Sequence, residues 1–188
     1  MFAIWLDILK QVPNSVLWLW NDNVDSKKNL RSWAARSRIA EERIVFAPSI
    51  PVADHLSRLK LADLFLDSLP YNAHTTASDA LWAGVPLLTC VGSTFAGRVA
   101  TSLLRAVGLD ELISDSLESY VQKAVAISRG DELRFLREKL EHNRLRYPLF
   151  NTDRYRLHLE RAYTTMWGRW RNGLGPESFH VPAIASDA

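Results

Sequence analysis

The residues from Leu64 to Cys90 read LFLDSLPYNAHTTASDALWAGVPLLTC, in which two short apolar runs flank a segment with helical spacing. Prolines and polar residues bound the two runs, as is typical of short buried strands. Gly84 is a natural end for a helix between them. The stretch therefore predicts a parallel strand–helix–strand unit: a strand over 64–67, a helix from 75 or 76 to 82, and a strand over 86–90.

The same alternation continues outward from this unit in both directions. Branched or aromatic runs predict further strands, and apolar residues three or four positions apart predict further helices. The expected strands are 16–20, 43–47 and 111–114, and the expected helices are 1–12, 27–38, 55–61, 95–107, 117–127, 132–144 and 154–171. This order predicts an α/β fold with a Rossmann-like, mostly parallel sheet and helices on both faces. We expect one domain over residues 1–172 and a flexible tail over 173–188.

The composition excludes several classes of protein, among them disulfide-rich and membrane-spanning ones. The chain has 188 residues, of which 47% are hydrophobic, and a formal net charge of +2. Its single cysteine, Cys90, excludes a disulfide framework and a cysteine-based zinc site. The apolar runs are far shorter than the roughly 18 residues that cross a bilayer. We therefore expect a cytoplasmic protein without a membrane partner.

The last expected helix interleaves basic residues with Trp167 and Trp170, a combination that also occurs in nucleic-acid-binding surfaces. Charges of both signs alternate from Asp131 to Arg171, which favours an ordinary solvated helix face. We therefore expect no nucleic acid among the partners.

The loop after the strand at 64–67 places His74, Thr75 and Thr76 where a helix begins. Free amides and a partial positive charge at such a position suit a phosphate or diphosphate. Asp79 has the wrong charge for a phosphate but can accept hydrogen bonds from sugar hydroxyls. Thr76 and Asp79 also have the spacing of a capping box, which is a purely structural role. The spacing leaves both interpretations open.

Two further groups of residues are weaker candidates for ligand binding. His55 and Arg58 share a helix face, which suits either a nucleotide cleft or a solvated surface. Residue type alone favours the solvated surface. The segment from Gly92 to Arg98 contains glycines but matches no full phosphate-binding motif. The remaining histidines have no ligand-like spacing, so we expect no metal and no bound cofactor.

The stretch from Asn72 to Pro86, NAHTTASDALWAGVP, resembles the C-terminal catalytic half of the O-linked N-acetylglucosamine transferases and their SPINDLY-type and bacterial relatives. Further agreement covers nearly all of residues 1–170: RIVFAP at 43–48, LADLFLD at 61–67, FAGRVA at 95–100 and YPLFNT at 147–152. The resemblance implies the C-terminal lobe of a GT-B glycosyltransferase that holds UDP-N-acetylglucosamine (UDP-GlcNAc) as donor substrate.

Carried onto matching positions, the resemblance implies a role for each candidate residue. His74, Thr75 and Thr76 would bind the diphosphate, Asp79 the ribose and His55 the uridine, with Arg58 close by and the backbone near Ile50 at the uracil edge. Val52 stands where several members have a lysine that contacts the ribose. No catalytic residue is assigned to this chain.

Family members precede this region with a strand, a lysine-bearing loop, an acceptor-side lobe and usually helical repeats. The resemblance therefore predicts a lobe that lacks its first, central strand, between the strands at 16–20 and 64–67, and that is a fragment of a longer protein. Transfer of N-acetylglucosamine to protein Ser or Thr hydroxyls is the expected activity, with the acceptor protein and the missing lobe and repeats as partners. The alternative is a non-catalytic, degenerate lobe that serves as a protein-interaction module.

Overall fold

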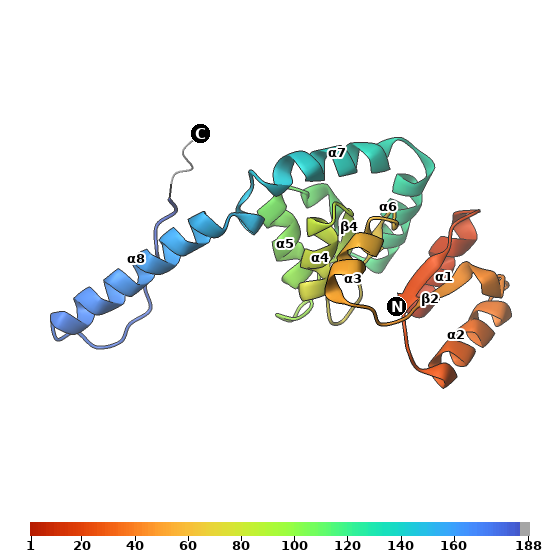
Figure 1. Ribbon diagram of the computed structural model, residues 1–188, viewed down its shortest axis with the longest axis horizontal. Helices are drawn as coiled ribbons and strands as arrows, with labels where there is room; N and C mark the ends of the chain where they lie inside the picture. The colour runs from red at the N-terminus through yellow and green to blue at the C-terminus, as the bar shows by residue number, and fades with distance from the viewer. Residues whose placement is uncertain (185–188) are drawn as a thin grey trace.

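Helices and short parallel strands alternate along residues 1–184, the part of the chain described by this computed structural model (Figure 1). The strands are β1 (Leu17–Trp20), β2 (Ile44–Ala47), β3 (Phe65–Leu66), β4 (Leu87–Cys90) and β5 (Ile113–Ser114). The helices are α1 (Phe2–Gln11), α2 (Val24–Arg36), α3 (Val52–Leu59), α4 (Thr75–Trp82), α5 (Val99–Val107), α6 (Leu117–Arg129), α7 (Glu132–Arg144) and α8 (Thr152–Arg171). Single 3-10 turns occur at η1 (Glu41–Arg43), η2 (Asp110–Leu112) and η3 (Pro148–Phe150). The predicted α/β class is confirmed.

α2 and α3 lie two to three residues earlier than the predicted 27–38 and 55–61, because Asn23 and Pro51 are their N-cap residues. Two other predicted boundaries are wrong for local reasons. The helix expected from residue 95 begins only at Val99, because the Gly92 amide donates to the Gly97 carbonyl (2.7 Å) and closes residues 92–97 into a loop. The strand expected over 111–114 is reduced to two residues, since η2 occupies its first half.

The parallel sheet is divided into two pieces. β1 pairs with β2, with Trp18 opposite Val45, and β4 lies between β3 and β5. Among the described residues, β1 and β3 each pair with a strand on one side only. This division agrees with the expectation that a central strand between them is missing.

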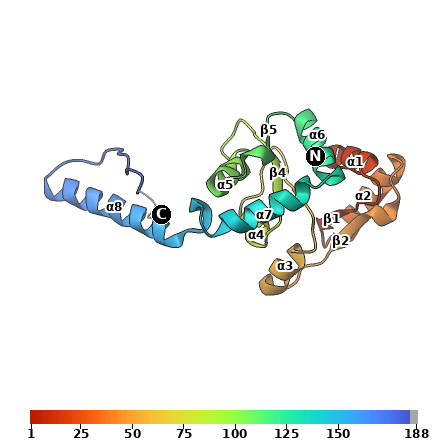
Figure 2. The same ribbon diagram turned by 90° about the horizontal axis from the view of Figure 1, so that it is seen from above.

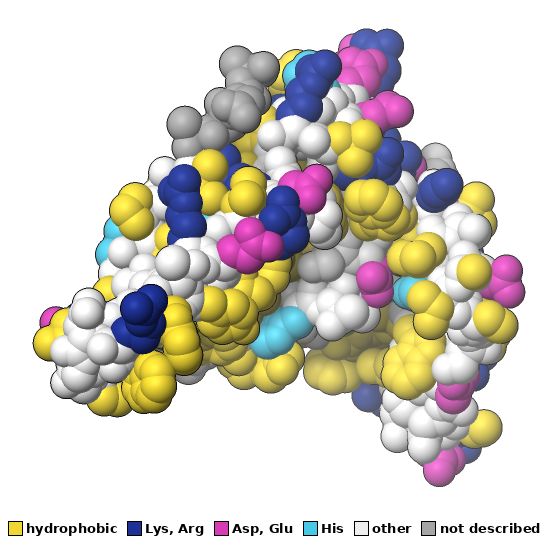
Figure 3. Space-filling view, turned by 60° about the vertical axis from the view of Figure 1, so that its left-hand side comes forward, with side chains coloured by type: hydrophobic (Ala, Val, Ile, Leu, Met, Phe, Trp, Pro, Cys, Tyr) yellow, Lys and Arg dark blue, Asp and Glu magenta, His cyan; other side chains and the backbone are white. Residues whose placement is uncertain are grey.

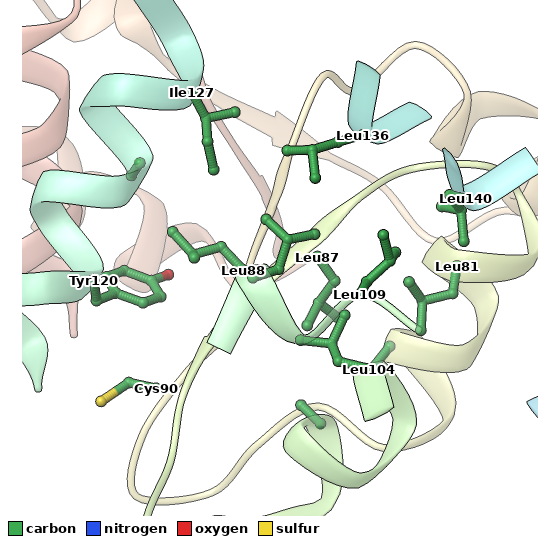
Figure 4. Close-up of a cluster of buried hydrophobic side chains, with 14 of the residues drawn as sticks. Leu81, Leu87, Leu88, Cys90, Leu104, Leu109, Tyr120, Ile127, Leu136 and Leu140 are labelled. Carbon is green, nitrogen blue, oxygen red and sulfur yellow. The ribbon is translucent and has the colours of Figure 1, made fainter. Parts of the chain in front are cut away.

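Each piece of the sheet has its own hydrophobic core. The larger core surrounds β4, all four residues of which are buried. Figure 4 shows Tyr120 and Ile127 of α6 on one side of Leu88, and side chains of α4 and α5 on the other. The smaller core packs α1 and α2 on β1 and β2, and α1 in turn contacts α6. Helices therefore cover both faces of β4, whereas β1 and β2 are covered on the face of Leu17 and Ile44 and carry exposed Trp20 and Val45 on the other.

The C-terminus of α1 is attached to β2 by Arg43. Its guanidinium donates to the carbonyl oxygens of Leu9 (2.8 Å), Val12 (2.8 Å) and Ser15 (2.7 Å). A cation at the end of a helix satisfies carbonyls that have no helical donor and complements the helix dipole. This contact fixes how α1 leads into β1.

α8 projects away from both cores, at the opposite end of the molecule from α1 and α2 (Figure 2). None of its 20 residues is buried. Hydrophobic side chains and arginines alternate on the surface that comes forward in Figure 3. The exposed apolar residues of α8 at helical spacing are Tyr155, Leu159, Tyr163, Met166, Trp167 and Trp170.

Residues 174–184 form neither helix nor strand and lie back along α8. The Ile184 amide donates to His158 Nε2 (3.2 Å), and Arg169 donates to the Gly175 carbonyl (3.0 Å). The last four residues of the tail expected over 173–188 lie outside the described residues. Within residues 1–184, no helix has the length and apolar character needed to cross a membrane.

Candidate nucleotide-binding site

His74 is the N-cap residue of α4, directly beyond the carboxyl end of β3. The first helical hydrogen bond runs from the Ser78 amide to the His74 carbonyl (3.1 Å). The amides of the first turn, at Thr75, Thr76 and Ala77, therefore lack helical acceptors, and both threonines are exposed. Such a helix end suits an anionic group.

The capping-box interpretation of Thr76 and Asp79 is wrong. The helix begins at Thr75, so Thr76 already lies within it, and the His74 side chain makes no capping hydrogen bond. Asp79 lies one turn further along, on the same face as Thr75 and Thr76, and is half-buried. The three side chains are thus placed together without being used to cap α4.

Two aromatic rings flank the His74 imidazole. The Tyr71 ring stacks on it, with centroids 4.7 Å apart and planes 20° apart, and the Phe95 ring approaches edge-on at 6.4 Å. His74 Nε2 lies 3.5 Å from the Ala96 carbonyl oxygen. Tyr71 and Phe95 are both exposed. The sequence offers no signal for this cluster, because it forms only when two separate loops pack together.

A buried carboxylate lies beneath this loop. Asp67, immediately after β3, accepts hydrogen bonds from the Ala73 amide (2.7 Å) and the Thr89 hydroxyl (2.6 Å). It is 2% exposed, and burial raises its pKa, an effect that the two hydrogen bonds partly offset. The sequence pattern predicts Asp67 as the last residue of a strand and assigns it no role, although a charged residue at the end of an apolar run is a visible signal.

The loop over residues 92–97 packs against the loop over residues 67–74, which carries His74. The Asn72 amide donates to the Ala96 carbonyl (2.9 Å). A Cβ atom added to Gly97 would stand 2.9 Å from the Pro70 carbonyl oxygen and 3.3 Å from the Gly92 Cα. Gly97 is therefore needed for close contact between two backbones.

We expect Gly97→Ala to push the two loops apart. If UDP binds at the α4 N-terminus, as the family resemblance implies, the substitution should weaken this binding by about tenfold, the equivalent of one lost hydrogen bond. Titration with UDP in a calorimeter measures this effect. Gly168→Ala is the matched control, because a Cβ atom there meets nothing within 4 Å. Equal UDP affinity in the two variants would contradict the role given to Gly97.

The second group of candidates lies on α3 and the loop before it. Arg58 Nη1 donates to the Pro48 carbonyl (2.7 Å), and its Nε donates to His55 Nδ1 (3.1 Å). Because Nδ1 of His55 accepts this bond, its neutral ring carries the proton on Nε2. Ile50 is exposed in the same loop. Arg58 thus holds both the imidazole and the turn that follows β2.

The two groups lie on neighbouring helices. α3 packs against α4 through a small cluster that includes Leu59, Ala80 and Val85. Because β2 and β3 precede these helices, both groups lie beyond the carboxyl ends of strands, where ligands bind in open α/β sheets. Within residues 1–184, His, Cys, Asp and Glu side chains form no group of three that could hold a metal ion.

Comparisons with known proteins place the chain in a family. The model of glycosyl transferase family 41 matches residues 1–159. The chain is 40% identical to a probable UDP-N-acetylglucosamine–peptide N-acetylglucosaminyltransferase, SEC, of Arabidopsis thaliana, covering 94% of this chain and 18% of that protein. It is 34% identical to the UDP-N-acetylglucosamine–peptide N-acetylglucosaminyltransferase of Caenorhabditis elegans, covering 91% of this chain and 15% of that one.

A solved structure agrees with these sequence matches. A mutant O-GlcNAc transferase of Thermobaculum terrenum superposes with a TM-score of 0.77 and 32% identity, over 88% of this chain and 33% of that chain. The chain thus spans less than a fifth of these two curated relatives and a third of the solved one. On the match to residues 1–159 and on these identities, the chain belongs to glycosyl transferase family 41.

Proposed function

We propose that the chain is the nucleotide-sugar-binding lobe of a transferase that moves N-acetylglucosamine from UDP-GlcNAc to Ser or Thr hydroxyls of an acceptor protein. The observation that carries this proposal is the open first turn of α4. Its unpaired amides and the exposed threonines stand beside His74 at the carboxyl end of β3. The names of the relatives supply the donor and the reaction class.

In this proposal the diphosphate of the donor binds at the N-terminus of α4. The amides of Thr75 and Thr76 and the His74 imidazole donate to its oxygens, and Asp79 accepts from the ribose hydroxyls. His55 and the backbone near Ile50 contact the uridine, with Arg58 holding the His55 ring. Donors aimed at the diphosphate stabilise the charge that develops as it leaves the sugar.

The rest of the transferase is the proposed partner of this lobe. β1 and β3 each pair on one side only within the described residues, and backbone groups at an open edge readily pair with another strand. A strand contributed between them would join the two pieces of the sheet. The proposal places any acceptor-side base outside this lobe, so the lobe alone binds the donor without transferring the sugar.

We expect His74→Ala to weaken UDP binding by about 10- to 100-fold, because hydrogen bonds to charged groups contribute roughly 1.5–3 kcal/mol. Asp79→Ala should weaken it less, since its partners are neutral hydroxyls. Calorimetric titration of the folded variants with UDP measures both effects.

Matched controls come from residues away from α4. His142→Ala and Asp153→Ala remove the same side chains from exposed positions on α7 and α8 and should leave UDP affinity unchanged. The absence of UDP binding by folded wild-type protein would overturn the proposal and favour a non-catalytic interaction module. Unchanged affinity in both His74→Ala and Asp79→Ala would also overturn it.

A further inference from the structure

The Asp67 carboxylate is shielded from any ligand but is directly connected to the proposed diphosphate site. One of its oxygens accepts the Ala73 amide at 2.7 Å, and the other accepts the Thr89 hydroxyl at 2.6 Å. Ala73 immediately precedes His74, the N-cap of α4. The bond to Asp67 therefore holds the peptide through which the chain enters the helix.

The backbone of Asp67 is itself held from the opposite side. The Tyr120 hydroxyl of α6 donates to the Asp67 carbonyl (2.9 Å) and lies 3.4 Å from the Trp5 indole nitrogen of α1. Tyr120 is fully buried, and burial raises the pKa of its hydroxyl, so the hydroxyl keeps its proton and remains a donor. Asp67 is thus fixed to helices outside the loop.

The residue before Ala73 is held separately. The Asn72 amide donates to the Ala96 carbonyl (2.9 Å), and the Asn72 side-chain amide donates to the Ser68 carbonyl (3.0 Å). The His74 ring itself has loose contacts: it stacks on the exposed Tyr71 of its own loop and lies 3.5 Å from the Ala96 carbonyl oxygen of the neighbouring loop. A surface stack of this kind permits sliding, whereas a short bond to a buried carboxylate, which Thr89 holds in turn, fixes the position of the Ala73 amide. Asp67 therefore fixes the amide next to His74, while the bonds of Asn72 fix the residue before it.

We propose that Asp67 is a positioning residue for the donor: by holding the Ala73 amide, it sets where the His74 imidazole and the free amides of α4 meet the diphosphate. The inference rests on the proposed function, because it presupposes that the diphosphate binds there. Asp67 acts through Ala73 and His74 and does not touch the ligand. Thr89 completes the carboxylate's hydrogen bonding without contributing to the loop.

The two partners of the carboxylate allow the positioning role to be separated from a purely structural one. Asp67→Ala removes the acceptor of the Ala73 amide, whereas Thr89→Val removes only the other bond and preserves side-chain shape. We expect Asp67→Ala to weaken UDP binding by about tenfold or more, and Thr89→Val to change it by less than about threefold. Asp67→Asn keeps one oxygen for Ala73 and should restore most of the lost affinity.

Coupling to His74 supplies a second readout. Because part of the effect of Asp67 passes through His74, the loss of UDP affinity in the double variant Asp67→Ala, His74→Ala should be clearly smaller than the product of the two single losses. Independent losses that multiply in the double variant would overturn the inference. So would wild-type affinity in folded Asp67→Ala, or equal losses in Asp67→Ala and Thr89→Val.

Amide hydrogen exchange on the wild-type protein tests the inference even if Asp67→Ala does not fold. UDP should slow exchange of the Ala73 amide by at least about tenfold more than that of the Val91 amide, which donates to the Ser114 carbonyl (2.9 Å) between β4 and β5. Equal slowing of both amides would indicate general stabilisation and overturn the inference. If wild-type protein does not bind UDP at all, the proposed function fails instead, which is a distinguishable result.

Discussion

Shortening Leu88 to alanine is expected to lower the free energy of unfolding by about 3–5 kcal/mol, at the upper end of such substitutions. Leu88 is fully buried in β4, which packs against α6, α5 and α4 within the larger core (Figure 4). Helices constrain both sides, so the surrounding side chains have little freedom to fill the cavity. Domains are stable by only about 5–15 kcal/mol, so this loss threatens the folded state itself.

Urea denaturation followed by tryptophan fluorescence measures the loss caused by Leu88→Ala. Leu61→Ala is the matched control, because Leu61 is 80% exposed and its truncation should change stability by less than about 0.5 kcal/mol. A loss below about 1 kcal/mol for Leu88→Ala would mean that β4 is not the centre of the larger core.

Supplying a strand between β1 and β3 is expected to raise the free energy of unfolding by at least about 3 kcal/mol. A short strand paired on both sides makes on the order of six backbone hydrogen bonds, each contributing about 0.5–1.5 kcal/mol net. Within residues 1–184, β1 and β3 have the unpaired edges that such a strand needs. UDP binding should strengthen too, because β3 leads directly into the loop that carries His74.

The experiment fuses to the N-terminus the segment that precedes the matched region in the Thermobaculum terrenum transferase. Urea denaturation and UDP titration are compared with the chain alone and with a fusion of the same length made of Gly and Ser, which has little tendency to form a strand. Stabilisation by the transferase segment alone supports the proposed completion of the sheet. Equal stability of the two fusions would refute it.

Local patterns in the sequence predicted most of the secondary structure correctly. α4 and β4 lie within about one residue of their predicted bounds, because the positive φ of Gly84 ends one element and Pro86 introduces the next. The start of α5 was missed, since the apolar spacing after Phe95 suits a helix while a hydrogen bond between Gly92 and Gly97 keeps it a loop. Local periodicity cannot reveal such a closure.

The sequence was sufficient to predict which residues form the candidate site. It was not sufficient to predict the tertiary contacts that hold these residues in place. The position of His74 at a helix start follows from the local pattern. Asp67 and Tyr120 are 53 residues apart and acquire their hydrogen bond only when α6 packs on the sheet. Phe95 likewise meets His74 through the contact between two loops. These pairings depend on tertiary packing, which the spacing of residues along a single element does not determine.

The exposed position of α8 has a consequence for how this chain melts. With no buried residue, α8 is stabilised by interactions within the helix and its returning tail: the Asn151 cap, the ion pair between Arg156 and Glu160 (2.8 Å) and the stacked rings of Trp167 and Trp170. A helix that is stabilised only by interactions between residues close in sequence unfolds through a gradual helix–coil equilibrium instead of an all-or-none transition. On heating, α8 should therefore unfold progressively before the two cores do. The far-ultraviolet circular dichroism signal should decline steadily well below the temperature at which the cores unfold.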